Sequence, residues 1–213
     1  MDGFTELRRT MVDCQLRTYE VTDRAVLAAA AEVPREAFLP PESSHLAYLD
    51  QAVPISGANR VLMAPMVTAR MIQVLDLAPG ETVLEYGGGT GYGAALMAAM
   101  GASVTLWEPE EAALTLAAGA LDRAGASGVV ATGVRPADGG FDAVLVSGAC
   151  EVAPVSLFGL VREGGRLIVV EGLGRSARVM LYRRAGGSMA ARPVFDAAAP
   201  PLAEFRRAPE FVF

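Results

Sequence analysis

The chain has 213 residues, of which 52% are hydrophobic and 20% are charged, and its formal net charge is −6. This length and composition predict one ordered globular domain, and the acidic balance argues against a general nucleic-acid-binding protein. No apolar run is long enough to span a membrane and the N-terminus has no signal-peptide core, so we expect a cytoplasmic protein with no membrane partner.

Residues 1–60 are predicted to form a helical N-terminal cap. Apolar residues recur at helical spacing over residues 2–17. A second helix is expected to begin with Thr22 as its cap and to stop before Pro34. Residues 38–59 are rich in turn-forming residues and are expected to be loops.

Residues 61–213 are predicted to form an α/β core. After a helix over 65–77, segments typical of strands alternate with segments typical of helices, which predicts a doubly wound, mostly parallel, Rossmann-like sheet. Strands are expected at 82–86, 103–108, 128–133, 141–149 and 164–172, and helices at 92–101, 109–125 and 152–161. A hairpin over 177–195, turning at 185–187, adds two antiparallel strands at one edge and makes seven in all. The tail, which ends in Phe211-Val212-Phe213, is expected either to add an edge strand or to pack across the core.

Several types of site are excluded by residue type. All 18 basic residues are arginine, which excludes Schiff-base chemistry and a phosphate-loop lysine. Cys14 and Cys150 are far apart and His45 is the single histidine, so no metal site is expected. A serine–histidine triad would depend on His45, but the chain has no nucleophile-elbow pattern.

The stretch "VLEYGGGTGYG" places four glycines between a predicted strand and a predicted helix. Glycines at such a turn let the backbone approach a ligand closely, and open α/β sheets bind ligands at this edge. The frame from Gly89 to Ala94 fits the G-x-G-x-x-A pattern of a dinucleotide site. A second frame combines Glu85 with Gly87, Gly89 and Gly91. A carboxylate there would repel a pyrophosphate but would suit the amino group or sulfonium of S-adenosylmethionine, which we therefore favour over a dinucleotide.

Glu108 ends the next predicted strand, about twenty residues further on, where an acid can hold both ribose hydroxyls. Both cofactor classes use such an acid, so Glu85 is the residue that discriminates between them. Trp107 is expected to pack in the core, with a place beside the adenine as the alternative.

The chain resembles the protein-L-isoaspartate O-methyltransferase family over most of residues 11–172. The segments "MVDCQLR", "VLAAAAEVPREAFLP", "AYLDQAVPI", "APMVTARMIQVL", "VLEYGGGTGY" and "GLVREGGRLIVVEG" follow one another as they do in that family. The resemblance implies a class I methyltransferase fold, S-adenosylmethionine as methyl donor, and cytoplasmic repair of isoaspartyl residues in protein or peptide substrates. It also implies that the cofactor loop includes Glu85, Gly87, Gly89, Gly91 and Tyr92, and that Glu108 is the ribose acid.

The sequence departs from this family at three positions. Met63 stands where the family has a serine that faces the reacting carboxylate, and a methionine cannot donate a hydrogen bond. Val134 stands where the family has an acid near the adenine, and Asp138 in the same loop is a weaker substitute. Glu151 is placed near the mouth of the cleft, where an acid would disfavour an anionic acceptor.

A carboxylate acceptor fits the scarcity of basic catalysts. Its pKa is about 4, so it is ionised at neutral pH and needs no general base. We expect backbone groups around Pro54, Ile55 and Met63 to hold it. Arg60 is either a cationic clamp or an exposed loop arginine, and residue type favours the second.

No catalytic group is assigned, because positioning can supply most of the rate. The alternatives are a methyltransferase of the same family with another acceptor, and a cofactor-binding protein that has lost catalysis. A nicotinamide oxidoreductase is a further, less favoured alternative.

Overall fold

The computed structural model describes residues 3–207. Helix α1 (Gly3–Met11) continues through a π-helical turn and a 3₁₀ turn to Tyr19, and α2 (Arg24–Glu32) follows. Asp23, and not Thr22 as predicted, caps α2, because its carboxylate accepts from the backbone N–H groups of Ala25 and Val26. No helix within residues 3–207 is long and apolar enough to cross a membrane.

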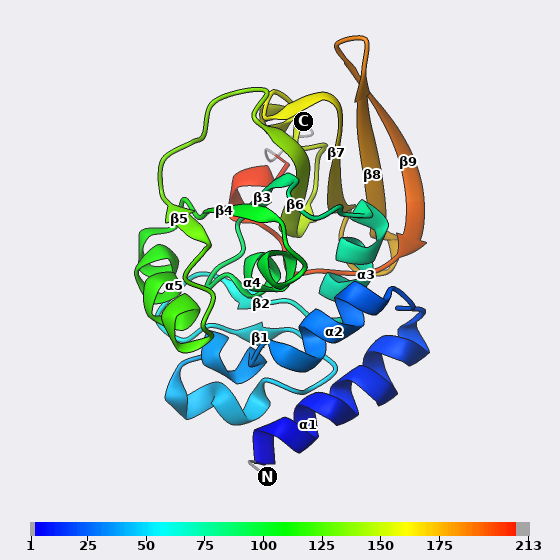
Figure 1. Ribbon diagram of the computed structural model, residues 1–213. Coiled ribbons are helices and arrows are strands. Elements are labelled where there is room, and N and C mark those ends of the chain that lie inside the picture. The colour runs from blue at the N-terminus through cyan, green and yellow to red at the C-terminus, as the bar shows by residue number, and fades with distance from the viewer. Residues whose placement is uncertain (1–2, 208–213) are drawn as a thin grey trace, which may run out of the picture.

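The main sheet has seven strands in the order β5-β4-β3-β6-β7-β8-β9 (Figure 1). The first five are parallel, and β8 and β9 continue from β7 as an antiparallel meander, so the predicted sheet with its edge hairpin is confirmed. The strands are β3 (Thr82–Tyr86), β4 (Ser103–Trp107), β5 (Val130–Thr132), β6 (Phe141–Cys150), β7 (Val161–Glu171), β8 (Arg178–Ala185) and β9 (Ser188–Asp196).

The two faces of this sheet are covered unequally. The cap and three helices, α3 (Pro65–Leu75), α4 (Tyr92–Ala99) and α5 (Glu111–Arg123), pack on one face. The other face meets the short α6 (Val155–Phe158) and a 3₁₀ turn at Ala203–Phe205. Residues 133–140, all of them described, join β5 to β6 as a loop without a helix. The second face therefore depends on the tail of the chain for its cover.

A two-stranded antiparallel sheet that the sequence did not predict lies at the junction of the cap and the α/β core. Strand β1 (Val53–Pro54) pairs with β2 (Val61–Leu62), and the N–H of Ile55 donates to the carbonyl of Arg60 at 3.0 Å across the loop between them. Strands of two residues are too short to show an apolar period, which is why the segment reads as a loop. This hairpin carries Arg60 and Met63 to the glycine turn.

The tail runs back along the end of β6. The N–H of Ala149 donates to the carbonyl of Pro200, and the N–H of Leu202 donates to the carbonyl of Ala149. In Figure 1 this segment, in red, lies beside the ends of β3 and β4. The predicted role of residues 208–213 as an edge strand or a core contact lies outside the described residues.

Candidate active site

The turn between β3 and α4 has the geometry that its glycines require. Gly87, Gly89 and Gly91 have φ angles of 66°, 59° and 90°, a left-handed conformation that strains other residues. An added Cβ at Gly89 would collide with Ile55 Cδ1, and one at Gly87 would lie 3.2 Å from Leu202 Cδ2. These glycines therefore allow the left-handed turn, and they let the side chains of Ile55 and Leu202 lie close against it.

Glu85 is buried directly beneath this turn. Its carboxylate accepts from the backbone N–H of Ala94 at 2.7 Å and from the hydroxyl of Ser147 at 2.5 Å. Burial raises the pKa of Glu85 to about 7, although both hydrogen bonds oppose the change. An added Cβ at Gly88 or Gly93 would overlap this carboxylate, so glycine at both positions leaves room for it. Gly88, Gly93 and Ser147 were not singled out from the sequence.

Glu108 is fully buried at the end of β4 and its carboxylate is surrounded by donors. The backbone N–H groups of Gly89 and Glu110 donate to it at 2.8 and 2.9 Å. Arg60 Nε donates to its two oxygens at 2.9 and 3.1 Å. The structure thus brings the predicted ribose acid and the glycine turn together, as the sequence implied.

Arg60 is buried, with 4% of its side chain exposed, so the interpretation as an exposed loop arginine is wrong. Its Nη2 forms ion pairs with Glu108 at 2.9 Å and with Glu204 of the tail at 2.5 Å. Burial alone would lower the pKa of Arg60, but the hydrogen bonds to Glu108 and Glu204 raise it. Residue type misled here because the burial depends on partners 48 and 144 residues away.

Met63 lines two small cavities, of about 20 and about 10 Å³. Both are lined by Val61, Met63 and Ser147, and one reaches Arg60 while the other reaches Glu85. The backbone carbonyl of Met63 accepts from Arg35 Nη2 at 2.5 Å. Met63 is therefore fixed between the buried acid and the buried cation.

Tyr92 and Ile55 are buried around the same turn. The Tyr92 ring has the guanidinium of Arg35 over its face, 4.6 Å from the centroid, and the ring of Phe38 at its edge. Ile55 closes over Gly89. Pro54, by contrast, is exposed on β1.

Glu151 and Val134 lie outside the group of residues described above around the glycine turn. Glu151 holds the tail, because its carboxylate accepts from the N–H of Arg207 and its own N–H donates to the carbonyl of Phe205. The side chain of Val134 is exposed on the loop after β5, where Asp138 pairs with Arg135.

Aromatic rings and the tail complete the edge of the site. Tyr86 contacts Trp107 and Phe205, with ring centroids 4.9 and 5.6 Å apart. The buried Nε1 of Trp107 has no hydrogen-bond partner among the described residues. Leu202 packs against Gly87 and Gly148. Leu202 and Glu204 were missed by sequence reasoning, since nothing local marks them as part of this edge.

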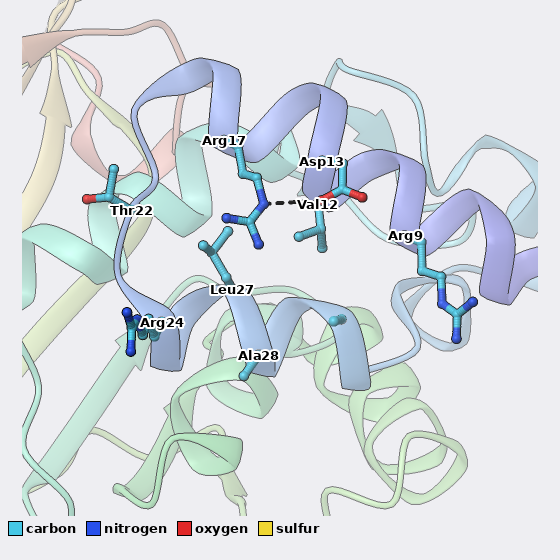
Figure 2. A pocket seen from close by; sticks show the side chains of 9 residues that line it. Arg9, Val12, Asp13, Arg17, Thr22, Arg24, Leu27 and Ala28 are labelled. Carbon is cyan, nitrogen blue, oxygen red and sulfur yellow. Dashed lines mark hydrogen bonds and ion pairs between the residues drawn. The ribbon is translucent and has the colours of Figure 1, made fainter.

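A much larger cavity lies elsewhere, between α2 and the helical segment that continues α1. It has a volume of about 560 Å³, and its lining includes the ion pair of Arg17 with Asp13 (Figure 2). None of the residues predicted to bind cofactor or acceptor lines it. No cluster of metal-binding side chains occurs within residues 3–207.

Comparison with known proteins decides the family. The family model described as Protein-L-isoaspartate(D-aspartate) O-methyltransferase matches residues 7–204. The chain belongs to this family. A protein-L-isoaspartate O-methyltransferase of Roseiflexus castenholzii is 38% identical over 205 residues, which are 93% of each chain. One of Methylorubrum populi is 40% identical over 173 residues, which are 78% of this chain and 79% of that protein.

Solved structures agree on the fold. A protein-L-isoaspartate O-methyltransferase superposes with a TM-score of 0.74 at 24% identity, covering 92% of this chain and 66% of the other. A Plasmodium falciparum structure described as a beta-aspartate methyltransferase, in complex with S-adenosyl-L-homocysteine, superposes with a TM-score of 0.77 at 18% identity. This superposition covers 96% of this chain and 100% of the Plasmodium falciparum chain. The sequence-based prediction of a methyltransferase of this family that uses S-adenosylmethionine is confirmed.

The residues at this edge fit that cofactor in chemistry. Gly87, Gly89 and Gly91 make a tight cradle, and the Glu108 carboxylate can accept from hydroxyls once Arg60 leaves it. Trp107 Nε1 is a buried donor with no partner among the described residues. The space at this edge is filled by the side chains of Arg60 and Leu202. The donors and acceptors are thus in place, and room for the cofactor requires that these two side chains move.

Proposed function

We propose that this protein methylates the side-chain carboxylate of isoaspartyl residues in damaged proteins in the cytoplasm. Membership of the family supports the reaction, and the relatives named above carry the corresponding name. A carboxylate acceptor is inferred from one observation, which is that Arg60 and Met63 line the same small cavity. A buried guanidinium is a strong partner for a carboxylate.

The cofactor would lie on the glycine turn. The backbone of Gly87, Gly89 and Gly91 would approach it, and Glu108 would accept hydrogen bonds from its ribose hydroxyls. Glu85 places a carboxyl group below the turn, and its ionised form would favour the cationic end of the cofactor. S-adenosylmethionine supplies the electrophilic methyl group when it is bound.

The chain's own residues would position the acceptor and exclude water. An acceptor carboxylate is already ionised at neutral pH, so it needs no general base. This agrees with the described residues that line the two cavities at Met63, which include neither histidine nor cysteine. Leu202 and Met63 are apolar walls that would keep water from the reacting atoms.

The test is mass spectrometry of an isoaspartyl peptide and its aspartyl twin after incubation with the protein and S-adenosylmethionine. We expect a gain of one methyl group on the isoaspartyl peptide alone. Glu108→Gln is the matched variant, and we expect it to lose the gain together with cofactor binding. A methyl gain on both peptides, or on neither while the cofactor binds, would refute the proposed acceptor.

A further inference from the structure

Arg60 joins two carboxylates that come from distant parts of the chain. Its guanidinium meets Glu108 at the end of β4 and Glu204 in the tail. The side chain of Glu108 is fully buried and that of Glu204 is 34% exposed. Such a buried ion pair is maintained only while its charges compensate each other, because a buried charge without a partner is strongly unfavourable.

The carboxylate of Glu108 has no acceptor site to spare. A carboxylate offers about four lone-pair sites. The N–H groups of Gly89 and Glu110 take one on each oxygen, and Arg60 donates to both oxygens. Two ribose hydroxyls can therefore bind Glu108 only if Arg60 releases it.

The position that Arg60 would take after release is limited by its surroundings. Its backbone is fixed, since its carbonyl accepts from the N–H of Ile55 and β2 begins at the next residue. Its second partner, Glu204, lies on a segment that is hydrogen-bonded to Ala149 and Glu151. A guanidinium that leaves Glu108 thus stays beside Glu204, at the cavity that it already lines with Met63 and Ser147.

We propose that Arg60 exchanges Glu108 for the carboxylate of the acceptor when the cofactor binds. This inference rests on the proposed function, which brings the acceptor to the same cavity. One guanidinium lies between two carboxylates in both states: Glu108 and Glu204 before the exchange, Glu204 and the acceptor after it. The guanidinium thus keeps two carboxylate partners, and it provides the hydrogen-bond donor that Met63 cannot provide. Glu108 keeps the N–H groups of Gly89 and Glu110, and the ribose hydroxyls replace Arg60 as its donors.

The exchange makes the acceptor site depend on the cofactor. Before the cofactor binds, Arg60 is occupied by Glu108 and the acceptor carboxylate has no cation. Binding of either ligand then strengthens binding of the other by the same factor, because coupling between two sites is reciprocal.

Calorimetric titration of the wild-type protein measures this coupling without turnover. The probes are S-adenosylhomocysteine and an isoaspartyl peptide. We expect the peptide to bind at least about fivefold more tightly when S-adenosylhomocysteine is saturating, and the converse titration to give the same factor. Equal peptide affinity with and without S-adenosylhomocysteine would overturn the exchange.

The variant Arg60→Gln separates the two roles of the side chain. Without the competing guanidinium, we expect S-adenosylhomocysteine to bind about tenfold more tightly than to wild type, as for the loss of one charged hydrogen bond. The coupling to the peptide should fall to about one. Weaker S-adenosylhomocysteine binding, or unchanged coupling, would contradict the proposal. Arg17→Gln removes an exposed arginine of the cap (Figure 2) and should change neither value.

The outcomes distinguish this inference from the proposed function. If the wild-type protein binds no S-adenosylhomocysteine, or no isoaspartyl peptide when S-adenosylhomocysteine is present, the proposed function and the exchange both fail. If it methylates the isoaspartyl peptide but shows no coupling, the exchange alone is wrong. If Arg60→Gln does not fold, the titrations of the wild-type protein decide, since they require no variant.

Discussion

Gly93 lies in the first turn of α4 with its Cα facing the carboxylate of Glu85. In Gly93→Ala the new Cβ would overlap Glu85 Oε1 and lie 3.0 Å from Glu85 Cδ and 3.2 Å from Leu145 Cδ2. The carboxylate can retreat only by giving up its hydrogen bonds from Ala94 and Ser147. At about 1.5–3 kcal/mol for each hydrogen bond to a charged group, this loss is about 3–6 kcal/mol. Alanine favours the helix by about 1 kcal/mol, so we expect a net destabilisation of about 2–5 kcal/mol.

Urea denaturation followed by circular dichroism measures this change in the free energy of unfolding. Gly119→Ala in α5 is the matched control, because its Cβ would meet only the flexible end of Arg123, at 3.3 Å. That variant should be more stable than wild type by up to about 1 kcal/mol, from helix propensity alone. If Gly93→Ala were as stable as wild type while Gly119→Ala gained stability, the carboxylate of Glu85 could not be held against α4 as described.

Three further predictions concern Glu85, Arg166 and Met63. Because burial raises the pKa of Glu85 from 4.5 to about 7, folding favours its protonated form. The free energy of unfolding should therefore fall by up to about 3 kcal/mol as pH rises through this window, and Glu85→Gln should remove that part of the slope in urea titrations at several pH values. Arg166 holds the end of α3 through the carbonyls of Leu75 and Asp76 and pairs with Glu81, so Arg166→Met should cost about 3–5 kcal/mol in the same assay. Met63→Ser restores a donor and should raise kcat/KM for an isoaspartyl peptide about tenfold, whereas Met63→Ala, which only makes space, should not.

The sheet could be predicted because its signals are local. Strand β3 is an uninterrupted apolar and β-branched run apart from its acid, as expected for a strand buried on both faces. The glycine turn and Glu108 followed from their spacing within one βαβ unit. Each of these features is specified by neighbours in sequence, so one segment suffices to reveal it.

The side chains that occupy the site could not be predicted from local signals of this kind. Arg60 is buried because Glu204 meets it across 144 residues, and Leu202 reaches Gly87 only after the tail has paired with β6. Neither contact leaves a periodic or spacing signal. Ser147 carried a weak signal, as a polar residue near the end of a long buried strand, where only a polar partner such as Glu85 stabilises it.

The attachment of the tail to Ala149 has a consequence for how this protein is made. The glycine turn, Glu85, Glu108 and Arg60 all lie before residue 109, whereas the segment that closes over them, residues 200–205, is synthesised well after them. A nascent chain can therefore form most of its sheet while Tyr86 and Gly148 are still uncovered. Only translation to the tail seals this edge, so an incomplete product is marked by an exposed apolar surface that quality-control proteases can recognise.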